Sequence, residues 1–202
     1  MLNRRRRAAL VVGLGTMRLA ELAWSSRNLR RAGSGSQAGR RSFPLMVAVN
    51  IGLFTWCVVP RRRRVPRGLE GLALTGLAAA AGLRLWVIAS LGQTWNVKAL
   101  VPEEMPVVTR GPYRWIRHPN YVAVAAEFAC LPLAVGAYGE ALVLSAANAA
   151  VLVPRIRAEE ALLDRVPGYR EAFAGVPRFV PRRRQTPVSD SQSRAESLPK
   201  PQ

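Results

Sequence analysis

Histidine, cysteine and acidic residues are scarce in this sequence of 202 residues. It contains one histidine and two cysteines, and 12 aspartate and glutamate residues stand against 30 lysine and arginine residues. Cys57 and Cys130 lie inside apolar segments, and no Cys/His spacing is of the zinc-binding kind. The composition therefore predicts no metal site, and it favours free, buried thiols over a disulfide or a metal cluster.

The excess of basic residues gives a formal net charge of +18. In a soluble protein this charge would suggest nucleic-acid binding through one basic patch. Here the arginines are split among short runs, such as Arg4 to Arg7 and Arg61 to Arg64, which alternate with apolar segments. That alternation is typical of proteins that cross a membrane several times, so we expect membrane lipids and no nucleic acid as partners.

Half of the residues are hydrophobic, and they gather in five segments. A membrane span needs about 20 apolar residues, and a soluble bundle of this size could not bury so many long apolar runs. We therefore predict an all-α integral membrane protein of about five transmembrane helices. The predicted spans are residues 8–24, 43–59, 69–91, 121–138 and 140–154.

The distribution of charge between the connections predicts an orientation. If all five segments span, the side that holds residues 25–42, 92–120 and the chain after 155 carries more Arg and Lys than the other side. The positive-inside rule then places the C-terminus in the cytoplasm. Residues 1–184 form one domain, and the polar, Pro/Ser-rich residues 185–202 form a tail that is predicted to be disordered.

Several ionisable residues fall within the predicted spans. Arg18 and Glu21 are three residues apart and can pair on one helix face. Arg84 and Glu127 lie in the third and fourth segments, where charged groups usually face the interior of a helix bundle or reach the headgroups. These residues also permit an alternative function, a non-enzymatic small transporter or assembly factor with a polar pathway.

The richest polar stretch is Gly-Pro-Tyr-Arg-Trp-Ile-Arg-His-Pro-Asn-Tyr at residues 111–121. It contains the single histidine, His118, which is a possible general base. The following proline restricts His118 to extended backbone, as a rigid ligand-binding loop requires. Trp115 is assigned to the aromatic belt at the membrane interface, whereas Tyr113 and Tyr121 fit either the belt or a ligand pocket.

A second polar stretch, Arg-Ile-Arg-Ala-Glu-Glu at residues 155–160, follows the last apolar segment. Arg155 and Glu159 are four residues apart and share one helix face. The carboxylate can accept hydrogen bonds from ribose hydroxyl or amino groups, and the guanidinium can hold a carboxylate. Taken alone, the pair is better interpreted as an ordinary salt bridge at a membrane interface.

Together these two stretches resemble the signature of the isoprenylcysteine carboxyl methyltransferase family, in the right order around two apolar segments. Residues 83–86 and 176–179 are also similar to that family. The resemblance implies an integral membrane enzyme that transfers a methyl group from S-adenosylmethionine to an acceptor from the lipid phase. It further implies a cytoplasm-facing cofactor pocket formed by the 92–121 loop and the C-terminal helix.

The resemblance also implies roles for single residues. Arg155 faces the acceptor, and Arg155 and Glu160 are the catalytic candidates. The implied contacts to S-adenosylmethionine are Lys98, Val107, Val108, Tyr113, His118, Pro119, Asn120, Tyr121 and Glu159. The acceptor is a lipophilic small molecule or a prenylated group, methylated on a carboxylate or on the oxygen of an isoprenoid or polyketide lipid. Aligning donor and acceptor and excluding water are the main demands of such a reaction.

Overall fold

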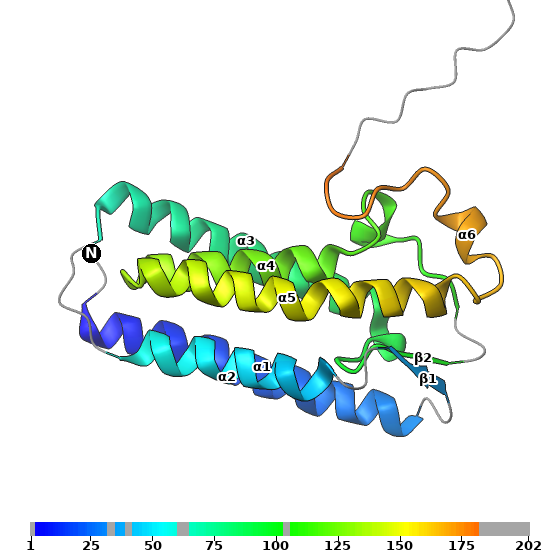
Figure 1. Ribbon diagram of the computed structural model, residues 1–202, viewed down its shortest axis with the longest axis horizontal. Helices are drawn as coiled ribbons and strands as arrows, with labels where there is room; N and C mark the ends of the chain where they lie inside the picture. Colours follow the sequence, from blue (N-terminus) through cyan, green and yellow to red (C-terminus); the bar gives the residue numbers. More distant parts are fainter. Residues whose placement is uncertain (1–2, 32–34, 39–41, 60–64, 103–105, 182–202) are drawn as a thin grey trace, which may run out of the picture.

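The structure is a computed structural model that describes residues 3–31, 35–38, 42–59, 65–102 and 106–181. The arginine run 61–64 and the predicted tail 185–202 lie outside the described residues. The predicted helical fold is confirmed, since most of the chain is helical (Figure 1). The five long helices are α1 (Arg4–Arg31), α2 (Phe43–Val58), α3 (Arg67–Leu91), α4 (Pro119–Ala134) and α5 (Tyr138–Leu163).

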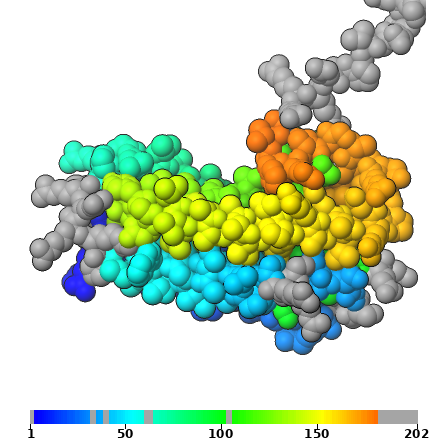
Figure 2. All heavy atoms as spheres, viewed as in Figure 1, coloured from blue at the N-terminus to red at the C-terminus, as the bar shows by residue number. Residues whose placement is uncertain are grey.

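The helices form two layers that face each other along their length (Figure 1). α1 and α2 lie side by side in one layer, and α3, α4 and α5 form the other. α3 and α4 approach closely at Gly76, where a Cβ atom would lie 2.6 Å from the Sγ atom of Cys130. In Figure 2, atoms of α5 occupy the face between those of α4 and α2.

The core between the layers is apolar. Leu53 of α2 and Phe128 and Leu131 of α4 are fully buried there. α2 and α4 each have a proline in their first turn, where the missing N–H group costs no helical hydrogen bond, whereas Pro132 and Pro154 lie inside α4 and α5. This core joins the layers but leaves space at one end of the bundle.

The predicted membrane spans correspond to the five helices. Within the described part of the chain, two helical segments are long and apolar enough to cross a membrane, Arg67–Thr94 and Tyr138–Leu163, and α2 is a shorter apolar helix. Leu72 and Leu142, on these two segments, are 71% and 75% exposed. Large exposed apolar side chains on such helices suit contact with lipid. Spanning by α1, α2 and α4 stays a prediction.

Two helices extend well beyond their predicted segments. α1 continues to Arg31, so the predicted loop 25–42 begins later, because contacts of the α1 end with other segments extend the helix. α5 continues through the polar stretch to Leu163 and is much longer than the predicted span 140–154. Two short strands, β1 (Gly35–Gln37) and β2 (Leu100–Pro102), also pair antiparallel, with Ser36 opposite Val101.

The short elements gather at one end of the bundle, which we call the site end (Figure 1). They are the 3-10 helices η2 (Gly92–Thr94) and η3 (Gly111–Arg114), the strands β1 and β2, and α6 (Tyr169–Ala172). The end of α1, the end of α3, the start of α4 and the end of α5 meet them there. The two sequence motifs, far apart in the chain, are thus brought to one place.

Candidate active site

A cavity of about 510 Å³ lies between the two layers at the site end. Its walls come from every long helix and from the segment between α3 and α4. The predicted site residues that line it are Val107, Val108, Tyr113, His118, Asn120, Tyr121, Arg155 and Glu159. Its size is in the range of pockets that hold a small molecule or cofactor.

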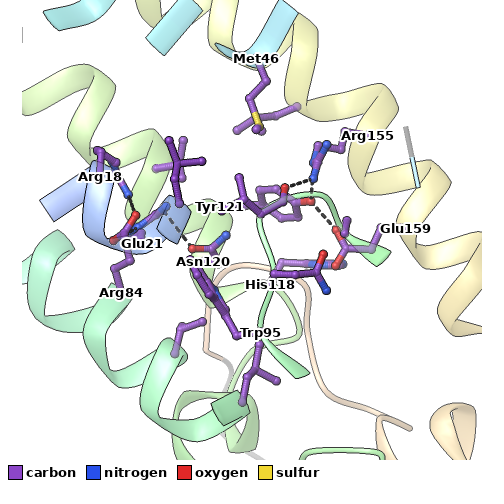
Figure 3. Close-up of a pocket in the computed structure, with 18 of the residues that line it drawn as sticks. Arg18, Glu21, Met46, Arg84, Trp95, His118, Asn120, Tyr121, Arg155 and Glu159 are labelled. Atoms are coloured by element: carbon purple, nitrogen blue, oxygen red, sulfur yellow. Dashed lines mark hydrogen bonds and ion pairs between the residues drawn. The ribbon is translucent and has the colours of Figure 1, made fainter. Parts of the chain in front are cut away.

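One wall of the cavity carries a hydrogen-bonded chain between α4 and α5 (Figure 3). The hydroxyl of Tyr121 donates to the Oε2 atom of Glu159 and accepts a bond of 3.3 Å from the Nε atom of Arg155. Arg155 and Glu159 therefore do not form the simple salt bridge that their spacing permits. Tyr121 stands between them and is nine-tenths buried, which favours the pocket over the aromatic belt for this residue.

One guanidinium nitrogen of Arg155 has no hydrogen-bond partner among the described residues. Its Nη2 atom donates to the carbonyl oxygen of Val97 at 2.5 Å, and its side chain is 2% exposed. The Nη1 atom is buried and has no hydrogen-bond partner among the residues that the structure describes. A buried charged donor without a partner is costly, so this atom marks a place for an acceptor oxygen from a ligand.

Val97, whose carbonyl oxygen accepts the bond from Arg155, is itself hydrogen-bonded to α1. The backbone N–H of Val97 donates to the Oγ atom of Ser25 at 2.9 Å. The side-chain amide of Asn28 donates to the carbonyl oxygens of Gly92 and Trp95, at 3.1 and 2.7 Å. The α1 helix thus fixes the segment after α3, and through it the guanidinium of Arg155.

His118 and Glu160 form a second group beside the cavity. The Nε2 atom of His118 lies 3.0 Å from the Oε1 atom of Glu160. Arg178 donates to both oxygens of the same carboxylate, from Nε to Oε1 at 2.8 Å and from Nη2 to Oε2 at 2.6 Å. An ionised carboxylate only accepts, so Nε2 carries the proton. Because Glu160 does not line the cavity, its predicted catalytic role stays a prediction, and its observed contacts are with His118 and Arg178.

The segment 176–179, which we call the C-terminal strap, passes beneath this group. The backbone N–H groups of Arg117 and His118 donate to the carbonyl oxygens of Pro177 and Arg178 at 2.9 and 3.0 Å. The ring of Phe179 lies 5.9 Å from the His118 ring. The strap therefore fixes both the backbone and the imidazole at the cavity wall.

Buried tyrosines close the cavity near α6. Burial raises the pKa of Tyr113 far above its ordinary value, and the nearby Glu159 raises it further. Burial is also the main reason why the pKa of Tyr169 rises to about 12. Both phenols are therefore neutral hydrogen-bonding groups near pH 7, and neither supplies a base.

Two predicted cofactor contacts do not line the cavity. The ammonium group of Lys98 lies 5.8 Å from the ring centre of Phe43, in a cation–π arrangement. Pro119 is fully buried in the first turn of α4, where it sets the direction of the helix. Their assignment as cofactor contacts stays a prediction.

Trp115 lies at the surface of the site end and is about half exposed. It packs edge-on against Trp86 of α3, with ring centres 5.4 Å apart. Trp24 of α1 and Trp86 are also about half exposed. Three half-exposed indoles at one end suit a membrane interface, as predicted for Trp115.

Five residues near the site received no site role from the sequence. They are Glu21, Ser25, Asn28, Arg84 and Arg178. Glu21 and Arg84 were recognisable as charges in apolar segments. Ser25 and Asn28 carry no local signal, because their partners lie more than 60 residues away in the chain.

The fold and the cavity define a class: a small helical membrane protein with a partly polar ligand cavity at one end of its bundle. The sequence profile of the isoprenylcysteine carboxyl methyltransferase (ICMT) family matches residues 72–165. An uncharacterized Bacillus subtilis (strain 168) protein, YpbQ, is 31% identical over 160 residues, which cover 77% of this chain and 95% of that protein. The chain belongs to the ICMT family. Family and fold together indicate a membrane methyltransferase.

Proposed function

We propose that the chain is a multi-pass membrane enzyme that uses S-adenosylmethionine to methylate an oxygen of a lipophilic acceptor. The observation that carries this proposal is the buried, unpartnered Nη1 atom of Arg155 beside a cavity that is polar at one side and apolar at the other. Such a donor can hold an acceptor oxygen while apolar walls hold a hydrocarbon chain.

The residues at the polar side fit the proposed methyl donor. S-adenosylmethionine, when bound, supplies an electrophilic methyl group on a positively charged sulfur. The carboxylate of Glu159 and the rings of Tyr113 and Tyr121 line this side, and carboxylates and aromatic faces stabilise such a cation. Asn120 offers a polar group on the same wall.

The apolar side of the cavity suits the tail of the acceptor. Leucine, isoleucine, methionine and phenylalanine side chains from α1 and α2 line it, namely Leu19, Leu22, Met46, Ile51 and Phe54. A hydrocarbon chain can move from the lipid to these side chains without exposure to water, whereas a polar acceptor would lose its hydration there. A lipid-phase acceptor is thus favoured over a water-soluble one.

The reaction places few demands on proton transfer. The bond that forms joins the acceptor oxygen to the methyl carbon, and the bond that breaks is the sulfur–methyl bond, whose electron pair stays on sulfur. Since Nε2 of His118 is occupied by Glu160, the site favours an acceptor oxygen that is already anionic near neutral pH. A carboxylate, as on a prenylated cysteine, or an acidic enol of a polyketide lipid meets this requirement.

We also propose that the site end faces the cytoplasm of a bacterial cell. The connections at this end hold most of the Arg and Lys outside the apolar segments, which supports this orientation through the positive-inside rule. Labelling of single cysteines introduced at the exposed residues 165 and 139, in a variant without Cys57 and Cys130, tests it. Labelling of residue 165 by an impermeant reagent in intact cells would contradict the orientation.

Calorimetry of the purified protein in detergent tests the enzyme assignment. We expect binding of S-adenosylmethionine and S-adenosylhomocysteine, weakened roughly tenfold or more by Glu159→Ala or His118→Ala. Arg155→Ala should retain cofactor binding but lose turnover, measured as a one-methyl mass shift in extracted lipids. Absence of binding of either compound by the wild-type protein would overturn the proposal.

A further inference from the structure

The side-chain amide of Asn120 has a fixed orientation at the cavity wall (Figure 3). Its Oδ1 atom accepts a hydrogen bond of 3.1 Å from the Nη1 atom of Arg84. A guanidinium group has only donors, so the amide oxygen, and not the nitrogen, must face Arg84. The NH₂ group of Asn120 is therefore the part of this amide that is left for a ligand in the cavity.

Arg84 is in turn held by α1. Its Nε atom donates to the Oε1 atom of Glu21 at 2.6 Å, and both side chains are more than nine-tenths buried. One guanidinium fork thus binds a carboxylate with one nitrogen and the Asn120 amide with another. This geometry requires arginine, because an ammonium group is a single point charge.

The other side of Glu21 connects to a second ion pair. The Oε2 atom of Glu21 accepts a bond of 2.6 Å from Arg18, and Arg18 also pairs with Glu127 of α4. Two guanidinium groups and two carboxylates from α1, α3 and α4 therefore balance each other inside the bundle. Unpaired, each of these charges would be costly in an apolar environment.

We propose that Arg84, oriented by Glu21, is a positioning residue that makes Asn120 a hydrogen-bond donor to an oxygen atom of the bound cofactor. This inference rests on the proposed use of S-adenosylmethionine, whose carboxylate and ribose hydroxyl groups are the available acceptors. It gives α1, which precedes the residues matched by the family profile, a direct part in building the cofactor site.

A purely structural role for the network predicts a different result from a positioning role. If the network is purely structural, every substitution that breaks one of its ion pairs lowers the midpoint of thermal unfolding. If Arg84 positions Asn120, substitutions of these two residues weaken cofactor binding. Substitution of Glu127 does not, because Glu127 neither lines the cavity nor contacts Asn120. Glu127→Gln is therefore the matched control.

The test is a double-mutant cycle on cofactor binding, with S-adenosylhomocysteine as the calorimetric probe. Arg84→Lys keeps the charge for Glu21 but loses the fork, and Asn120→Asp keeps the acceptor for Arg84 but loses the donor to the ligand. We expect each to weaken binding roughly tenfold. The double variant should bind no more weakly than Asn120→Asp alone, because Arg84 acts through Asn120.

Each outcome of the cycle decides the proposal. The positioning proposal is overturned if the losses of affinity of the two single variants multiply in the double variant, or if Arg84→Lys binds as tightly as the wild type. Binding by the wild-type protein would still support the proposed function in either case. A loss of affinity in Glu127→Gln equal to that in Arg84→Lys would assign the network to stability alone. Should Arg84→Lys yield no folded protein, the same cycle with Glu21→Gln and Asn120→Asp replaces it.

Discussion

Arg178 and His118 share one carboxylate, that of Glu160, although Arg178 belongs to the C-terminal strap and His118 precedes α4. Arg178 bonds both carboxylate oxygens, and His118 bonds one of them. The arrangement ties the last described segment of the chain to the cavity wall. Its effect should therefore appear in ligand binding more than in global stability.

Replacing Arg178 tests this link. The Arg178 side chain is 55% exposed, and exposed ion pairs add little to folding stability, so Arg178→Ala should leave the thermal midpoint nearly unchanged. Cofactor affinity should fall several-fold, because the strap and the His118 ring lose their common anchor. Arg178→Lys should restore part of the affinity. Arg170→Ala, which removes an exposed pair with Asp164, is the control, and an equal loss there would contradict the prediction.

Gly111 is one of the points where the 111–121 motif meets α3. Its φ angle is +62°, and a Cβ atom there would lie 2.1 Å from the Oγ atom of Ser90. Gly111→Ala should lower stability by about 1–3 kcal/mol through strain and displacement of the loop. Gly82→Ala in the same α3 helix meets no neighbouring atom and should be neutral or stabilising. Thermal unfolding of both variants in detergent provides the comparison.

Two adjacent serines at the end of α1 allow a matched pair of substitutions. Ser25 accepts from the backbone of Val97, whereas Ser26 donates only to Leu22 in its own helix. Ser25→Ala should reduce turnover, because the carbonyl that holds Arg155 loses its support. Its effect on cofactor affinity should be smaller. Ser26→Ala should change neither quantity, and equal kinetics for the two variants would contradict the role given to Ser25.

Tyr169 predicts a loss of stability at alkaline pH. Its folded pKa of about 12 lies above the ordinary value of 10.0. The stabilisation is complete below pH 10 and is lost as pH rises from about 10 to about 12, because only the unfolded state releases the proton in that range. Tyr169→Phe should show a shallower fall of the thermal midpoint over this range. An identical pH profile in the variant would refute the assignment.

The motifs at 111–121 and 155–160 could be predicted because each is a continuous string of residues. Their meeting in one cavity followed from the resemblance and not from the residues themselves. The different roles of Glu159 and Glu160 show what could not be predicted from the sequence. Adjacent residues on a helix point about 100° apart, so one lines the cavity while the other contacts Arg178, and the helix rotation that decides this depends on distant neighbours.

The contribution of α1 to the site could not be predicted from the sequence for a similar reason. Glu21, Ser25 and Asn28 act on segments more than 60 residues further along the chain. Pairing of Arg18 with Glu21 was predicted from their spacing and is confirmed. The spacing carries no information about Arg84 and Glu127, which complete the network from other helices.

The pairing of Arg18 with Glu21 bears on how the chain is made. α1 leaves the ribosome before α3 and α4 exist, so its two buried charges have no partners from those helices during insertion. Because they pair three residues apart on the same helix, α1 would carry no isolated charge into the bilayer if it spans the membrane as predicted. Once α3 has been made, Arg84 pairs with the other carboxylate oxygen of Glu21. The charges are therefore paired in the order in which their helices are synthesised.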